Sequence, residues 1–197
     1  MATLLTNPRR SLSLAEYLLL PYDGRKTEFV NGQIEKMAEA SPLHVEIIAL
    51  LTELIKAHIK AQGLSLVCYA GVGIEIPRTD APHNVRDPDL VVCDRAQWKA
   101  MRHLTKAIFL EGLPPALAIE VASPGDTGRD TVDKRLEYAL ARVPEYWIIN
   151  PVDDYVLVLT LDGDAYTEIG EFRGDEAIIS KLFPSFNVTA DHLLDPA

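Results

Sequence analysis

A carboxylate in the middle of an apolar strand is the first residue of this sequence that could do chemistry. Glu120 lies in the run 117–122, where side-chain alternation puts Leu117, Ile119 and Val121 on one face and Glu120 between two alanines on the other. A buried carboxylate is costly unless a cation or hydrogen-bond donors compensate it, and the alanines leave room for a ligand. From this strand alone, a solvated face or an arginine partner explains Glu120 equally well.

A second carboxylate, Asp89, follows Pro88 at the start of the apolar run 90–93. An aspartate after a proline is commonly part of a turn. If its strand pairs beside the strand of Glu120, however, the two carboxylates converge, and like charges that close require a shared proton or cation. Mg²⁺, or Mn²⁺ in its place, binds one or two protein carboxylates and phosphate oxygens, and the backbone carbonyl of Val121 is a further candidate ligand.

The segment 129–142 predicts a helix that could bring a cation to these acids. Asp130, Lys134 and Tyr138 have i, i+4, i+8 spacing and share one stripe, close to the strand end that carries Glu120. Lys134 could instead form an ordinary surface pair with Asp130, worth about 0.3–0.5 kcal/mol. The apolar residues of the segment predict a different, core-facing stripe: Val132, Leu136, Ala139, Leu140 and Val143.

The elements that must position these residues form a mixed β-sheet with helices packed against it. Asn31-Gly32 predicts a hairpin turn between strands 26–30 and 33–37, and Ser41-Pro42 opens a long amphipathic helix that Gly63 ends. Strand, helix and strand follow one another over 117–150, which implies two parallel strands with a right-handed crossover. The remaining expectations are strands at 65–69, 72–76, 89–93, 155–161 and 165–172, a helix at 95–105, a short helix capped by Ser11 or Ser13, and a polar loop at 77–85.

Composition narrows the function classes. The chain has 197 residues, of which 48% are hydrophobic, and no apolar run is long enough for a membrane span. We expect one domain over 1–197, with 1–10 as a flexible N-terminal segment. The net charge of −10 argues against a protein that coats nucleic acid through bulk positive charge, but not against one that grips a few phosphates. Cys68 and Cys93 lie outside any CxxC pattern, which favours a reducing, cytoplasmic location.

Taken in order, these segments resemble the PD-(D/E)XK nuclease superfamily, and most closely its Uma-two family of restriction-type endonucleases. The resemblance extends from about Ser11 to about His192, and the stretches that carry it are 28–34, 41–44, 86–92, 118–126, Asp130, Lys134, Tyr138 and 145–151. It implies an α/β fold with a restriction-endonuclease-like mixed β-sheet flanked by α-helices. It also implies that Asp89 and Glu120 are metal ligands and that Lys134 is the motif lysine, displaced from its usual position, here Ala122, to the following helix.

The resemblance further implies one polar site residue from the early helix. His44 matches the family position and lies on the inward stripe. Glu46 is the alternative site residue, but it is turned away from that stripe, because a helix rotates by about 100° per residue. Tyr138 or Asp130 would position Lys134, and Arg86, Arg129 and Arg135 are candidates to hold flanking phosphates.

The implied function is metal-dependent endonuclease activity on nucleic acid, with DNA favoured over RNA. The alternative is a catalytically silent interaction module with the same fold, because a fold does not fix a function. Exposed edge strands and two-fold symmetric substrates also favour a homodimer.

Overall fold

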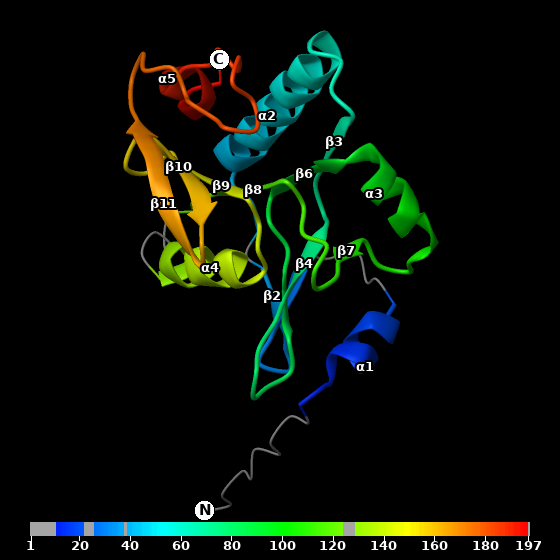
Figure 1. Ribbon diagram of the computed structural model, residues 1–197. Coiled ribbons are helices and arrows are strands. Elements are labelled where there is room, and N and C mark those ends of the chain that lie inside the picture. The colour runs from blue at the N-terminus through cyan, green and yellow to red at the C-terminus, as the bar shows by residue number, and fades with distance from the viewer. Residues whose placement is uncertain (1–10, 22–25, 38, 124–128, 197) are drawn as a thin grey trace, which may run out of the picture.

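Two β-sheets form the frame of the molecule, with helices on both sides of the larger one (Figure 1). The computed structural model describes residues 11–21, 26–37, 39–123 and 129–196, although the side chains of 129–131 are outside the description. The predicted fold class, a mixed sheet flanked by helices, is confirmed, and a second sheet adds to it.

The larger sheet has six strands in the order β11-β10-β9-β8-β6-β3. Its β8–β9 pair is parallel and its other pairs are antiparallel, so the sheet is mixed as expected. In the chain, α4 (Arg129–Leu140) lies between these two parallel strands, and the three together form the predicted strand–helix–strand unit. The strands are β3 (Leu66–Tyr69), β6 (Leu90–Asp94), β8 (Leu117–Val121), β9 (Glu145–Asn150), β10 (Tyr155–Asp162) and β11 (Ala165–Phe172).

The smaller sheet has five strands in the order β2-β1-β5-β4-β7. The hairpin turn at Asn31-Gly32 is confirmed, and both residues have the positive φ angles, 52° and 75°, that a tight hairpin of this kind requires. Residues 84–86 form β5, so the predicted polar loop ends earlier than expected, and β7 was not predicted. The strands are β1 (Thr27–Val30), β2 (Gln33–Lys36), β4 (Gly73–Ile76), β5 (Asn84–Arg86) and β7 (Ile108–Phe109).

Helices cover both faces of the larger sheet. On one face α2 (Pro42–Ala61) and α5 (Ala190–Leu194) pack over Leu117, Ile119 and Val121, and on the other α4 (Arg129–Leu140) and β4 pack over Ala118. Ser41 caps α2 by accepting a hydrogen bond from the backbone N–H of His44, with Pro42 at the first helical position. No helix in the described part of the chain is long and apolar enough to cross a bilayer.

Two helical expectations need correction. The helix predicted at 95–105 is shorter, with α3 (Arg95–Ala100) followed by a 3₁₀ turn, η1 (Met101–His103). On α4 the predicted core stripe is right for Ala139 and Val143, which are buried, but wrong for Val132, Leu136 and Leu140, which are 56–62% exposed. Tyr138, predicted on the polar stripe, is buried. The helix turns its polar stripe inward so that Lys134 and Tyr138 reach β8, and that rotation leaves the apolar row in solvent. The short helix α1 (Leu14–Leu19) begins at Ser13, one of the two predicted caps.

Candidate active site

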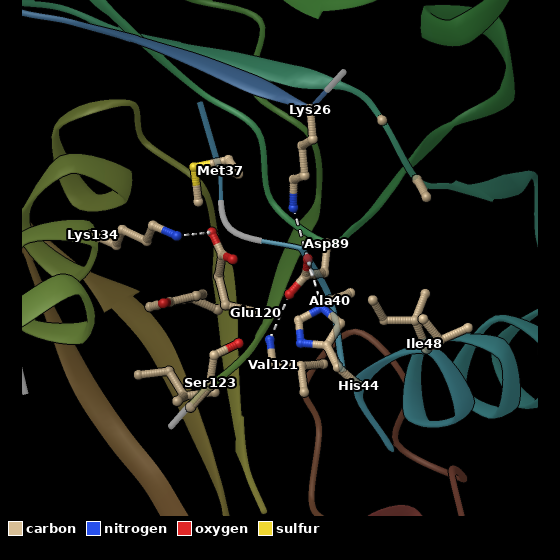
Figure 2. Close-up of a pocket in the computed structure, with 16 residues that line it drawn as sticks. Lys26, Met37, Ala40, His44, Ile48, Asp89, Glu120, Val121, Ser123 and Lys134 are labelled. Atoms are coloured by element: carbon tan, nitrogen blue, oxygen red, sulfur yellow. Dashed lines mark hydrogen bonds and ion pairs between the residues drawn. The ribbon is translucent and has the colours of Figure 1, made fainter. Parts of the chain in front are cut away.

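The pairing of β6 with β8 brings the two predicted acids together. Leu90 lies opposite Ile119 in an antiparallel register, so Asp89 and Glu120 follow one step beyond. Both residues are buried, each with 7% exposure. They line one cavity of ≈ 290 Å³ between the first turns of α2, the end of β8 and α4 (Figure 2). The juxtaposition on which the sequence prediction depended is therefore present.

Three donors hold the carboxylate of Asp89. Lys26 Nζ lies 2.7 Å and His44 Nε2 3.2 Å from its Oδ1, and the backbone N–H of Val121 donates to Oδ2 at 2.8 Å. Burial by itself raises the pKa of Asp89, but the contacts with His44 and Lys26 outweigh it, so the pKa lies well below its ordinary range. Asp89 is thus a firmly ionised carboxylate.

Glu120 is held on one oxygen only. Its Oε1 accepts a hydrogen bond from Tyr138 Oη at 2.6 Å and lies 3.2 Å from Lys134 Nζ. Among the described residues, no donor contacts its Oε2. Burial raises the pKa of Glu120, against the opposing effect of Lys134. A second oxygen thus remains available in the cavity.

Lys134 reaches the acids from α4. Lys134 is 7% exposed, and its Nζ also lies 3.8 Å from Glu28 Oε1 on β1. Tyr138, one turn further along α4, is fully buried and contacts the same oxygen of Glu120. Ala122, where the superfamily usually has its lysine, lines the cavity without an amine. The helix therefore supplies the cation that the strand lacks.

A ring of charges surrounds this centre. Arg86 on β5 donates to Glu28 Oε2 at 2.6 Å and to Glu137 Oε2 at 2.5 Å, and it is 8% exposed. Arg86 therefore pairs with carboxylates inside the protein, which corrects the expectation that it holds a flanking phosphate. Arg135 forms a surface pair with Glu168 at 3.2 Å, and the side chain of Arg129 lies outside the described residues.

Asp87, beside the motif, marks an excess of negative charge. Its Oδ1 is buried and has no hydrogen-bond partner in the described structure. Burial raises the pKa of Asp87 to about 6; Lys26 opposes the rise, and Glu28 and Asp89 add to it. Four acids of this cluster, Glu28, Asp89, Glu120 and the half-buried Asp87, face three permanent cations, which are Lys26, Arg86 and Lys134. An additional cation near Asp89 would relieve that repulsion.

Of the two predicted early-helix residues, His44 lines the cavity and Glu46 does not. His44 points at Asp89 from the first turn of α2, whereas Glu46 is exposed and does not line the cavity. The geometry thus favours the first of the two early-helix candidates. Asp130 lies on α4, but its side chain is among those that the structure does not describe.

The donor set fits a hard divalent cation. Besides the two carboxylates, the carbonyl of Val121 has a suitable direction, because the N–H of Val121 points to Asp89 while that of Ala122 bonds to Ile149 on the opposite side. In a strand, the N–H and C=O of one residue point to the same side. Oxygen ligands of this kind suit Mg²⁺ or Mn²⁺.

Sequence reasoning missed two features. Lys26 and Glu28 join the site from the first hairpin, and only the charge of Glu28 within the short strand 27–30 could have indicated a buried partner. At the far end of β4, Glu75, His83 and Glu111 bring ligand atoms within 4.8 Å of one another. Glu75 accepts the backbone N–H of Glu111 at 2.9 Å and contacts His83 at 2.7 Å, so this group pins neighbouring loops together.

Comparisons with known proteins identify the family and agree with the fold. The model of the Uma2 family, described as "Putative restriction endonuclease", matches residues 14–191. A crystal structure described as "a putative nuclease belonging to DUF820", from Anabaena variabilis, superposes with a TM-score of 0.72. It shares 20% sequence identity, and the alignment covers 93% of this chain and 97% of the other. A comparison with curated proteins finds no match.

Proposed function

Because the chain belongs to the Uma2 family of restriction endonucleases, we propose that it is a metal-dependent endonuclease that hydrolyses phosphodiester bonds of DNA. One observation carries the proposal: Asp89 and Glu120 lie side by side in one cavity, with the ammonium of Lys134 3.2 Å from Glu120. DNA is favoured over RNA because the family description names restriction enzymes.

Asp89, Glu120 and the carbonyl of Val121 would hold Mg²⁺ or Mn²⁺. Such an ion, when bound, polarises a phosphate oxygen and lowers the pKa of a coordinated water molecule. Glu120 suits this role because its Oε2 is open to the cavity while Tyr138 and Lys134 fix its Oε1.

The side chains around the acids do the positioning. Lys134 Nζ can donate to the attacking water or to an oxygen of the transition state, where developing negative charge strengthens the contact. Tyr138 fixes the orientation of Glu120 and thereby of Lys134. On the other side, Lys26 and His44 fix Asp89, and Lys26 is the more exposed of these two side chains, at 35% against 12%. Lys26 is therefore placed to exchange Asp89 for a substrate phosphate.

The test is cleavage of supercoiled plasmid by the purified protein with Mg²⁺ or Mn²⁺. We expect nicking by the wild type and a loss of at least about a hundredfold in Asp89→Asn, Glu120→Gln and Lys134→Met, the size that removal of one transition-state contact commonly gives. His44→Ala should also lose activity. Glu46→Gln is the matched control, because Glu46 lies on the same helix but outside the cavity.

Equal nicking by the wild type and the acid variants would remove the assignment. Carboxylate-dependent Mn²⁺ binding without cleavage of any nucleic acid would favour the silent interaction module instead. The homodimer and the cytoplasmic location stay predictions, and sedimentation at increasing protein concentration tests the first of them.

A further inference from the structure

A second crevice, of ≈ 450 Å³, lies between the C-terminal half of α2 and β3. Its floor is apolar and its rim is basic. We call its polar lining the basic groove, which consists of Lys56, Lys60, Tyr69 and Arg95. All three cations are exposed, in a chain whose net charge is −10.

The basic groove and the catalytic cavity lie on the same face of α2. Residues eleven apart in a helix are three turns apart and have nearly the same direction. Val45 lines the cavity and Lys56 lines the groove at that spacing, as do Ile48 and Ile59. Along β3 the two hollows adjoin, because Tyr69 lines the groove and Ala70, the next residue, lines the cavity. The two hollows thus follow one another along one face of α2.

Cations dominate the walls of this groove. Lys56 and Lys60 are one turn apart on α2, and Arg95 lines the groove at the start of α3. The exposed Lys99 and Arg102 follow Arg95 at i+4 and i+7 spacing into η1 and lie outside the lining. Two acids lie nearby. Glu53 is exposed on α2, and Asp94 uses its carboxylate to cap α3 through the N–H groups of Ala96 and Gln97.

An aromatic pair separates the two basic walls. Tyr69 stacks on Trp98 with ring centroids 4.3 Å apart, and Lys56 Nζ lies 5.9 Å from the centroid of the Tyr69 ring. Both rings are half-buried. Cations that follow a backbone, together with an exposed aromatic surface, are the features with which proteins bind nucleic acid without reading its sequence.

We propose that the basic groove binds the sugar–phosphate backbone of the DNA substrate where it leaves the catalytic cavity. This inference rests on the proposed nuclease function. From His44 to Lys56 and Lys60, α2 rises about 18 Å and 24 Å, at 1.5 Å per residue. At about 3.4 Å per base pair, the groove contacts phosphates roughly five to seven base pairs from the cut, on one side only.

The experiment measures DNA affinity in the Glu120→Gln protein, which leaves the substrate intact. Fluorescence anisotropy compares two labelled duplexes, one extending about three and one about twelve base pairs on each side of the cut. Lys56→Gln/Arg95→Gln tests the groove. Lys181→Gln/Arg142→Gln is the matched control, because it also removes one exposed lysine and one exposed arginine, from surfaces outside both hollows.

We expect the groove variant to lose about tenfold in affinity for the long duplex, and to lower the slope of log affinity against log salt by about 1.8, which is two phosphate contacts. The short duplex should bind the groove variant and its parent equally, and the control pair should match the parent on both. Unchanged binding of the long duplex by the groove variant would overturn the proposal, as would an equal loss in the control or no DNA binding by the parent.

The two proposals fail separately. If the wild type cleaves plasmid but the groove variant binds like its parent, only the groove assignment is lost. If the parent binds long duplexes through the groove but the wild type does not cleave, the groove stands and the nuclease mechanism is lost.

Discussion

Glu120 and Glu145 are buried carboxylates on neighbouring parallel strands, and they are satisfied in opposite ways. Glu145, at the start of β9, is 2% exposed and has four uncharged donors. Ser180 Oγ and Trp147 Nε1 donate to its Oε1 at 2.6 and 2.7 Å, and the backbone N–H groups of Lys181 and Leu182 donate to its Oε2 at 2.9 Å. Glu120, at the end of β8, has one oxygen engaged and one facing a cavity.

The difference separates a structural acid from an acid available for chemistry. A carboxylate whose two oxygens are closed by neutral donors fixes the chain around it and has no capacity left for a ligand. One that is fixed by a single oxygen keeps its direction and retains a coordination position. Burial alone, which is similar for the two residues, would not distinguish them.

The largest expected effect is on stability. Glu145→Gln replaces one acceptor oxygen with a donor group and leaves buried N–H or O–H groups unpaired, which should cost about 3 kcal/mol of unfolding free energy. Glu120→Gln should change it by less than about 1 kcal/mol, because burial already disfavours the charged form, as its raised pKa indicates. Urea unfolding followed by circular dichroism measures both. Similar losses in the two variants would contradict the distinction.

The next effect is stabilisation by metal. At about one hundred times its dissociation constant, Mn²⁺ should add about 2.7 kcal/mol to the unfolding free energy of the wild type. Glu145→Gln should gain the same increment from its lower baseline, whereas Glu120→Gln should gain little. The unfolding curves are recorded with and without Mn²⁺. An equal gain in Glu120→Gln would place the ion elsewhere.

Removing one hydroxyl donor from each carboxylate tests the same contrast between Glu120 and Glu145. Tyr138→Phe removes the hydrogen bond to Glu120 and should weaken Mn²⁺ binding by about tenfold, because removing a residue that orients a metal ligand commonly has an effect of this size. Ser180→Ala removes a donor to Glu145 and should cost about 1 kcal/mol of stability without a change in Mn²⁺ affinity. Calorimetric titration and urea unfolding of both proteins give the two readouts. The distinction fails if their effects are interchanged.

The smallest effect is on thiol labelling. Cys68 and Cys93 are 1% and 0% exposed, and burial raises their pKa values to about 11 and about 12, so iodoacetamide at pH 8 should modify the folded protein very slowly. Labelling should accelerate in Glu145→Gln, which opens more often, and should match the wild type in Glu120→Gln. Mass spectrometry over a time course follows the modification. Rapid labelling of the wild type would show that the sheet opens locally around these thiols.

Local patterns were sufficient to predict most of the sheet and the direction of its key carboxylate. Alternation along 117–122 predicted that Glu120 lies on the other face of the strand from Leu117, Ile119 and Val121. These three residues lie in one core, and Ala118, on the face of Glu120, lies in the other. Whether Asp89 would meet Glu120 depended on strand pairing, which no local pattern encodes. The family resemblance supplied that pairing, together with the role of Lys134.

The failures have a common cause. The apolar residues Val132, Leu136 and Leu140 predicted the buried face of α4, but Lys134 and Tyr138 occupy it because Glu120 requires their donors. Lys26 has no sequence signal at all, since a lysine ahead of a strand is usually solvated, and its partner is 63 residues away. At these positions contacts with buried carboxylates replace the usual apolar contacts, and hydrophobic patterning cannot detect that.

The contacts that hold Asp89 allow the protein to fold before any metal ion binds. Lys26, His44 and the backbone of β8 hold this acid without any ion, and α4 does the same for Glu120. Zinc fingers behave differently, because their chains are unfolded until the metal arrives. Under the proposed metal-dependent mechanism, a chelator would therefore stop cleavage without unfolding the protein. Returning the ion would restore activity at the speed of diffusion rather than of refolding.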